Sequence, residues 1–240
     1  MKKLLNTLYV TTPEAYLSKD GLNVVVSVDK EELFRIPVMN VEGIVTFGYM
    51  GASPGLMKLC MDNNVSLVFM SPQGRFICRV QGATHGNVLL RKKQYSLSED
   101  ENVALHLAKL FITGKVFNTR GILQRFTRDN GADEEVEQTI KQLEWRKKCV
   151  LKAENMDILR GEEGHAANSY FEVFDHLIIH QKTDFPFNGR NRRPPKDEVN
   201  AMLSFVYTLI ANDVSAALES VGLDPYVGFM HTLRPGRTSL

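Results

Sequence analysis

The stretch Leu159-Arg160-Gly161-Glu162-Glu163-Gly164-His165-Ala166-Ala167-Asn168-Ser169-Tyr170-Phe171 combines a helical pattern with a carboxylate on its apolar face. Apolar residues recur at helical spacing one turn and more after Glu163, at Ala167, Tyr170 or Phe171, Phe174, and Leu177 or Ile178. We therefore expect the Glu163 carboxylate to point inward. A buried carboxylate is costly unless it is protonated, paired with a cation or bound to a metal ion. The residues alone do not decide among these three states. They are also explained by an ordinary charged residue at the start of a helix.

The region before this helix is expected to begin with a β-rich unit. Short runs of β-branched and aromatic residues, bounded by turn-forming residues, predict strands at 22–28, 42–47, 65–70 and 75–80. Ser71-Pro72-Gln73-Gly74 is typical of a hairpin turn between the last two strands. Ser53-Pro54 predicts a helix start, with Leu56, Leu59 and Cys60 facing inward and Met61 as a further candidate.

Long helices are expected after Gly86. Apolar residues follow a helical period at 103–117, 134–153 and 199–221. Strand signals stop between Gly82 and Gln94, where glycines and Asn87 interrupt the pattern. The predicted fold class is α+β, with a small β-rich domain at 1–86 and a larger all-helical domain at 87–240.

Composition indicates a folded, soluble protein with enough apolar material for a core. The 240 residues are 43% hydrophobic and carry a formal net charge of +1, which by itself does not suggest a nucleic-acid partner. Charge is uneven, however, because 102–128 contains cations and no Asp or Glu: Lys109, Lys115, Arg120, Arg125 and Arg128. A DNA-facing surface and a solvated helix face both explain this run.

The cysteines and the apolar runs point to the cytoplasm. Cys60, Cys78 and Cys149 lie far apart, in no spacing typical of a disulfide framework or a structural zinc site. The apolar stretch at the N-terminus is too short for a signal peptide, and no later run is expected to reach membrane length.

Four stretches in the second half resemble the CRISPR-associated integrase family, the adaptation proteins that insert new spacers into a CRISPR array. The first is the Arg160–Phe171 run. The others follow in the family's order: Arg192-Arg193-Pro194-Pro195-Lys196-Asp197 with Val199-Asn200-Ala201-Met202-Leu203-Ser204-Phe205, then Gly222-Leu223-Asp224-Pro225-Tyr226, and Gly228-Phe229-Met230-His231. The family's architecture, a β domain before a helical catalytic domain, agrees with the expected fold.

The resemblance implies a metal site for Mg²⁺ or Mn²⁺. The family binds a divalent ion through a glutamate, a histidine and a later acidic residue, which places ligands at Glu163 and His231. No counterpart of the third ligand lies within the 240 residues, and we expect it beyond Leu240. Glu162 is rotated about 100° from Glu163 and is expected to face solvent or the helix start.

A basic loop and several other residues are expected to contact DNA. Guanidinium and ammonium groups at 182–196 suit phosphate oxygens beside a metal site. The predicted DNA-binding residues are Arg190, Arg192, Arg193, Lys182, Arg120, Arg125 and Tyr170. Packing in the core is the first explanation for Tyr170.

A second metal site is possible on the same helix. Glu172, His176 and His180 succeed one another at one-turn spacing, on a polar stripe with Ser169 and His165. Paired histidines at this spacing can chelate zinc, and a solvated polar face explains them as well.

The resemblance implies an endonuclease or integrase that joins spacer DNA 3′-ends to a repeat by transesterification. The implied partners are double-stranded DNA, a second copy of the chain and the small companion CRISPR-associated protein; no membrane is expected. One alternative is a non-catalytic DNA-binding or assembly module, because the third ligand is missing. Another is a metal-dependent nuclease unrelated to CRISPR.

Overall fold

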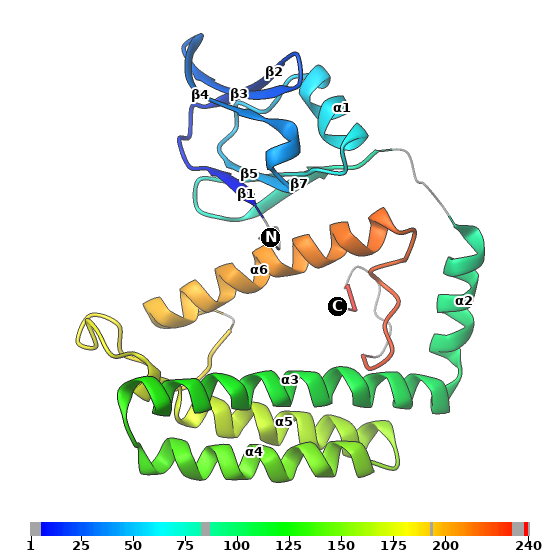
Figure 1. Ribbon diagram of the computed structural model, residues 1–240, viewed down its shortest axis with the longest axis vertical. Coiled ribbons are helices and arrows are strands. Elements are labelled where there is room, and N and C mark those ends of the chain that lie inside the picture. The colour runs from blue at the N-terminus through cyan, green and yellow to red at the C-terminus, as the bar shows by residue number, and fades with distance from the viewer. Residues whose placement is uncertain (1–5, 83–86, 193, 232–237, 240) are drawn as a thin grey trace. The chain divides into compact units, whose positions relative to one another are not determined.

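The computed structural model describes residues 6–82, 87–192, 194–231 and 238–239, and its elements are shown in Figure 1. The chain divides into two compact units. The first unit comprises Met1–Asn87 together with Thr208–Gly222, and the second comprises Val88–Tyr207 together with Leu223–Leu240. Each unit has a hydrophobic core of its own.

The first unit contains two β-sheets. The larger sheet has the strand order β1-β5-β6-β7, in which β1, β5 and β6 run parallel and β7 pairs antiparallel with β6. The smaller sheet is antiparallel with the order β2-β3-β4. The bounds are β1 Thr7–Val10, β2 Tyr16–Asp20, β3 Asn23–Val28, β4 Glu31–Pro37, β5 Gly43–Phe47, β6 Ser66–Met70 and β7 Phe76–Val80, with a short 3-10 turn η1 at Val38–Asn40.

The core of the first unit lies between the sheets and one helix. Helix α1 (Pro54–Asp62) begins where Ser53 Oγ accepts a hydrogen bond from the Leu56 amide at 3.2 Å. Leu56 and Cys60 are fully buried, and they belong to the same apolar cluster as Val24, Ile44 and Leu67. The predicted helix start and its inward-facing residues are therefore confirmed, and Met61 is partly buried against this cluster.

The four strands expected from sequence are present, whereas β1, β2 and β4 were not predicted. The turn at 71–74 joins β6 and β7, with the Gly74 amide bonded to Ser71 O at 2.8 Å and Gly74 at φ 76°. The missed strand β4 is largely exposed and carries charge: Arg35 pairs with Asp20 of β2 and with Glu32. A strand with little buried surface has no alternating apolar pattern to reveal it.

The second unit is helical. Its elements are α2 Val88–Glu99, α3 Glu101–Asn130, α4 Glu134–Lys152, α5 Met156–Glu172 and a 3-10 turn η2 at Phe174–Leu177. Helices α3, α4 and α5 pack side by side (Figure 1), with Leu123, Leu143 and Leu159 fully buried in one cluster. Asp100, Asp133 and Asn155 cap the three helices, each accepting a hydrogen bond from a backbone amide of the first turn.

The β-rich region followed by helices confirms the predicted α+β class. Helix α6 (Glu198–Ser220) corrects one expectation, because it is long and apolar enough to cross a membrane by length and composition, with a mean hydropathy of 1.4. A single helix of this kind is weak evidence for a membrane span. Within the first unit, Glu219 of α6 forms an ion pair with Arg79 of β7.

Candidate active site

Helix α5 carries the candidate metal ligand and is fixed at its first turn. Asn155 Oδ1 accepts a hydrogen bond from the Ile158 amide at 2.9 Å. Leu159 and Ala166 are buried against α3 and α4, so the helix turns a fixed face to the core. Glu162 and Glu163 lie between these two apolar anchors.

The Glu163 carboxylate is partly buried and already paired with a cation. Its Oε1 accepts a hydrogen bond from Lys115 Nζ of α3. The Glu163 side chain is 27% exposed and lines a small cavity of about 90 Å³ together with Thr119, Tyr170 and Arg192. The carboxylate that was expected to point inward is therefore partly buried and lines a cavity.

The expectation that Glu162 faces solvent or the helix start is wrong. Its carboxylate pairs with Arg146 of α4 at 2.9 Å, and its side chain is only 19% exposed. Successive helical residues are rotated by about 100°, so the two carboxylates turn to different neighbouring helices. Glu162 is a link between α5 and α4, and Glu163 a link between α5 and α3.

The segment that ends at His231 is held from two sides. On one side Gln94 of α2, a buried residue, donates to the carbonyls of Asp224 and Val227 at 2.8 and 2.9 Å and accepts from the Asp224 amide at 2.9 Å. On the other side Arg160 of α5 donates to the Met230 carbonyl at 2.7 Å. Because Arg160 lies one turn before Glu163, this bond joins the His231 segment to the helix of the other candidate ligand.

His231 is exposed and lines a larger cavity of about 760 Å³. The charged residues of that cavity are mostly acidic, namely Glu99, Glu101, Glu154 and Asp157, with Arg160 as the cation. Glu163 does not line this cavity. The described residues thus place the two candidate ligands on neighbouring parts of the second unit and not in one common cavity.

The donor chemistry of Glu163 and His231 fits a divalent ion. Carboxylate oxygen and imidazole nitrogen are ligands that Mg²⁺ or Mn²⁺ accepts, and the Glu163 carboxylate already accommodates a positive charge. Over the ranges described here, no group of three or more His, Cys, Asp or Glu side chains is placed to hold a metal ion. The two residues therefore supply part of a ligand set.

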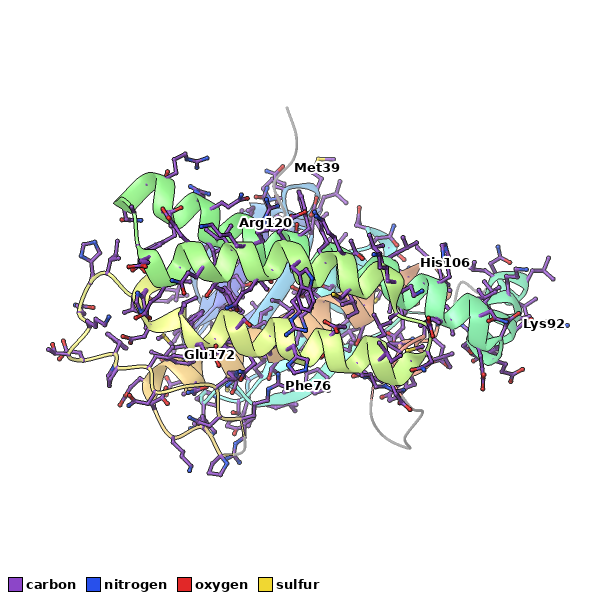
Figure 2. All side chains as sticks on the ribbon, turned by 90° about the horizontal axis from the view of Figure 1, so that it is seen from below. Met39, Phe76, Lys92, His106, Arg120 and Glu172 are labelled. Carbon is purple, nitrogen blue, oxygen red and sulfur yellow. The ribbon has the colours of Figure 1, made fainter. Side chains whose placement is uncertain are left out.

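The rival zinc stripe is not formed, because α5 ends at Glu172 (labelled in Figure 2) and His176 lies in the 3-10 turn η2. His176 Nδ1 lies 2.7 Å from Asp133 Oδ2, and its Nε2 lies 3.3 Å from Glu135. The contact with His176 lowers the pKa of Asp133 below its ordinary value, together with the hydrogen bond from the Val136 amide. Glu172 instead accepts from Asn168 at 2.7 Å.

In the basic loop, the structure separates the arginines that were predicted together. Arg190 makes its contacts within the second unit. It donates to Asn200 Oδ1 at 2.7 Å, and its guanidinium lies over the Tyr207 ring at 5.6 Å. Burial, with the charge of Arg192 next, lowers the pKa of Arg190. Arg192 is exposed and reaches the Glu163 cavity, and Arg193 lies outside the described residues.

The remaining predicted DNA contacts have partners within the protein. Arg120, labelled in Figure 2, pairs with Glu144 at 3.1 Å and is mostly buried. The other two cations are more exposed: Lys182 pairs with Asp175 at 2.7 Å and Arg125 with Asp129 at 3.3 Å.

Tyr170 packs edge-on against Phe171 and Phe174 while also lining the Glu163 cavity. Burial, and then the nearby Tyr207, raises the pKa of its hydroxyl. Tyr170 is therefore both a packing residue and a cavity residue.

Sequence reasoning missed two residues that organise the site. Lys115 was recognised only as one cation in a basic run, because nothing local indicates a partner 48 positions away. Gln94 was not recognised, because its partners lie 130 or more positions later. For Lys115 the basic run was a signal in the sequence. A single glutamine such as Gln94 provides no such signal.

A family profile described as CRISPR associated protein Cas1 matches residues 8–240. The chain is 45% identical over 243 residues to CRISPR-associated endonuclease Cas1 1 of Chlorobaculum tepidum, and 47% identical over 247 residues to CRISPR-associated endonuclease Cas1 2 of Rhodospirillum rubrum. Each comparison covers 100% of this chain and 71% of the relative.

Solved structures share the fold at lower identity. A CAS1 protein from Thermotoga maritima superposes with a TM-score of 0.74 at 21% identity, covering 98% of this chain and 71% of that one. A casposase bound to integration product gives 0.74 at 20% identity over 97% of this chain and 66% of that one. A Cas6-RT-Cas1–Cas2 complex gives 0.71 at 21% identity, over 99% of this chain and 26% of that chain.

Proposed function

The chain belongs to the Cas1 family of CRISPR associated proteins, and from this membership we propose that it is a subunit of a metal-dependent DNA integrase of CRISPR adaptation. The reaction is the joining of spacer DNA 3′-ends to a repeat by phosphodiester transesterification. The observation that carries the proposal is the Glu163 cavity, where one carboxylate lies among the cations Lys115 and Arg192. The two cations there are complementary to a phosphodiester, and the carboxylate is complementary to a divalent ion.

The proposed reaction requires two things of the protein: neutralisation of charge at the phosphoryl group, and positioning of the DNA backbone and of the ligands. A divalent ion held by Glu163 and His231 would lower the pKa of the attacking 3′-hydroxyl and neutralise charge developing on the phosphoryl oxygens. Arg192 is exposed at the cavity, so its guanidinium is available to a phosphate oxygen of the DNA backbone. Arg160 and Gln94 hold the backbone that carries His231. No side chain has to form a covalent intermediate.

A third ligand is expected from an acidic residue after Leu240. Support comes from the relatives, of which this chain spans 71%. Two ligands, one of them neutral, leave a magnesium or manganese ion short of negative charge. We therefore expect the 240 residues alone to bind the ion weakly and to be poorly active. A version that also includes the expected acidic residue, called the extended chain below, should be active.

The proposed partners are double-stranded DNA, a second copy of the chain and the small companion adaptation protein, in the cytoplasm. Two fold neighbours support this: one is named as a casposase bound to integration product and another as a complex of Cas1 with Cas2. The second candidate function is a non-catalytic DNA-binding or assembly module. It is favoured by the incomplete set of metal ligands among the described residues.

We expect the first unit to mediate dimerisation, because its two sheets have edge strands, such as β4 and β7, that could pair with a second copy. Light scattering of the 240-residue chain at micromolar concentration should then report twice 27.1 kDa. A mass of 27.1 kDa across the concentration range would reject the dimer.

Replacing Arg192 by alanine should weaken binding to specific and unrelated DNA alike. Loss of one phosphate contact should also flatten the salt dependence of the affinity by roughly one slope unit. Neutralising Arg190, Arg192 and Arg193 together should flatten it further. Fluorescence anisotropy over a potassium chloride series measures both quantities.

Arg190→Ala is the matched control, since Arg190 bonds to Asn200 and stacks on Tyr207. It should lower the melting temperature more than Arg192→Ala does, and change the salt slope less. An altered sequence preference with an unchanged slope would instead indicate that these arginines read bases.

The proposed function is tested by strand transfer. The extended chain, mixed with its companion protein, Mn²⁺ and a labelled duplex, should join the duplex to a repeat-containing DNA. DNA binding without any joined product, under conditions that give a stable complex, would favour the assembly module.

A further inference from the structure

The small cavity beside Glu163 has an unusual balance of charge. Its polar lining consists of Lys115 and Thr119 of α3, Glu163 and Tyr170 of α5, Arg192 and Tyr207. Glu163 is the one carboxylate among the residues that line it, against two cations. With Lys115 on Glu163 the pair is neutral, and the cavity keeps the charge of Arg192 alone.

Lys115 and Glu163 depend on each other. Glu163 is the ion-pair partner of Lys115, and Lys115 that of Glu163, with no other salt bridge to either side chain within the ranges the structure describes. Lys115 is 52% exposed and Glu163 is 27% exposed, so the ammonium sits at the cavity mouth and not in a sealed core. If a second cation binds Glu163, the exposed Lys115 ammonium can therefore move away from the carboxylate.

A divalent ion and the Lys115 ammonium cannot share the Glu163 carboxylate without cost. Both bind carboxylate oxygen at short range, the ion at about 2.0–2.2 Å and the ammonium at about 2.8 Å. Two cations held that close repel each other strongly in a partly dehydrated site. The lysine side chain has a flexible four-carbon stem, so the ammonium can move while the helix stays in place.

We infer that Lys115 is a phosphate-positioning residue that alternates between Glu163 and a DNA phosphate at this cavity. With the metal site empty, Lys115 neutralises Glu163. Once Glu163 holds a divalent ion, Lys115 is released and joins Arg192 in facing a backbone phosphate. Metal binding and DNA binding then strengthen each other, and the coupling is reciprocal. The inference rests on the proposed metal role of Glu163.

The lysine exchange can be measured without metal or catalysis. In EDTA, Glu163→Gln removes the negative charge that pairs with Lys115 and leaves only a neutral acceptor, so it should raise the affinity of the 240-residue chain for a short duplex by about 5-fold or more. Glu162→Gln is the matched control, because it removes the same charge from the adjacent residue, whose partner is Arg146. It should leave the affinity nearly unchanged.

The same experiment is repeated in a Lys115→Met background. There the gain from Glu163→Gln should disappear, since no ammonium is left to release. Lys115→Arg should restore the gain by keeping a cation in place, and circular dichroism verifies that all variants fold. An equal gain with and without Lys115, or an equal gain from Glu162→Gln, would overturn the exchange.

Metal affinity gives the second measurement. Titration with Mn²⁺, followed by electron paramagnetic resonance, should show tighter binding in Lys115→Met than in the unchanged chain, because the competing ammonium is gone. Lys109→Met, on the same helix but with no salt bridge in the described chain, should show no change. Unchanged or weaker Mn²⁺ binding in Lys115→Met contradicts the inference.

The two possible failures are distinguishable. If Glu163→Gln leaves Mn²⁺ binding unchanged while the DNA result in EDTA holds, Lys115 releases as proposed and the metal role of Glu163 is wrong. If Glu163→Gln abolishes Mn²⁺ binding while Lys115→Met changes neither metal nor DNA affinity, the metal role stands and the lysine exchange is wrong.

Discussion

Replacing Glu163 or His231 by alanine should abolish strand transfer by the extended chain without abolishing DNA binding. Each change removes a ligand of the proposed ion, and the loss should exceed the roughly 10–100-fold that follows when only the support of a ligand is disturbed. DNA binding should survive because Arg192 and the other exposed cations are untouched. Joined products on a denaturing gel measure the first quantity, and gel shift measures the second.

His176→Ala is the control for this experiment. His176 contacts Asp133 and Glu135, away from the Glu163 cavity, so its loss should affect stability and spare the chemistry. If His176→Ala destroyed strand transfer and the Glu163 and His231 variants kept it, the active site would lie at η2 and not on α5.

Replacing Gln94 by leucine should reduce strand transfer by about 10–100-fold, although Gln94 touches no proposed ligand directly. The buried amide makes three hydrogen bonds to the backbone of Asp224 and Val227. Leucine removes these three bonds, and each peptide group that stays desolvated without a partner costs about 1–3 kcal/mol. The segment carrying His231 should then be held to α2 less firmly, by the Tyr95 hydroxyl on the Asp224 carboxylate at 2.9 Å.

Gln138→Leu provides the comparison, since Gln138 is an exposed glutamine of α4. The two variants should be compared by strand transfer and by hydrogen exchange of the Val227 and Met230 amides. Faster exchange in Gln94→Leu alone, together with reduced activity, is expected. Full activity of Gln94→Leu would mean that Arg160 and Tyr95 suffice to hold the segment.

The sequence predicted the strands and helices with regular apolar patterns, and it missed the three short strands β1, β2 and β4. The parallel strands β5 and β6 and the helices α3 to α5 have buried faces, and these faces produce regular apolar patterns. Strands β2 and β4 lie at the edges of a small sheet and are stabilised in part by Arg35 with Asp20 and Glu32. Ion pairs between separate strands produce no periodic pattern in the amino-acid sequence.

The sequence indicated which residues belong to the candidate site, but not which of them contact one another. The pattern on α5 correctly singled out Glu163 as a carboxylate near the core, but it could not provide Lys115, which comes from another helix. The same pattern extended the helix through His176, whereas the chain leaves the α-helix after Glu172. Helical spacing was continued there beyond the end of the helix, and that produced a zinc stripe that does not exist.

Crystals of the extended chain grown with Mn²⁺, measured at the manganese absorption edge, show whether Glu163 binds the ion. The anomalous difference map should show a peak in contact with the Glu163 carboxylate, with Lys115 turned away from it. A peak bound by His176 with Asp133 and Glu135, and none at Glu163, would contradict the account.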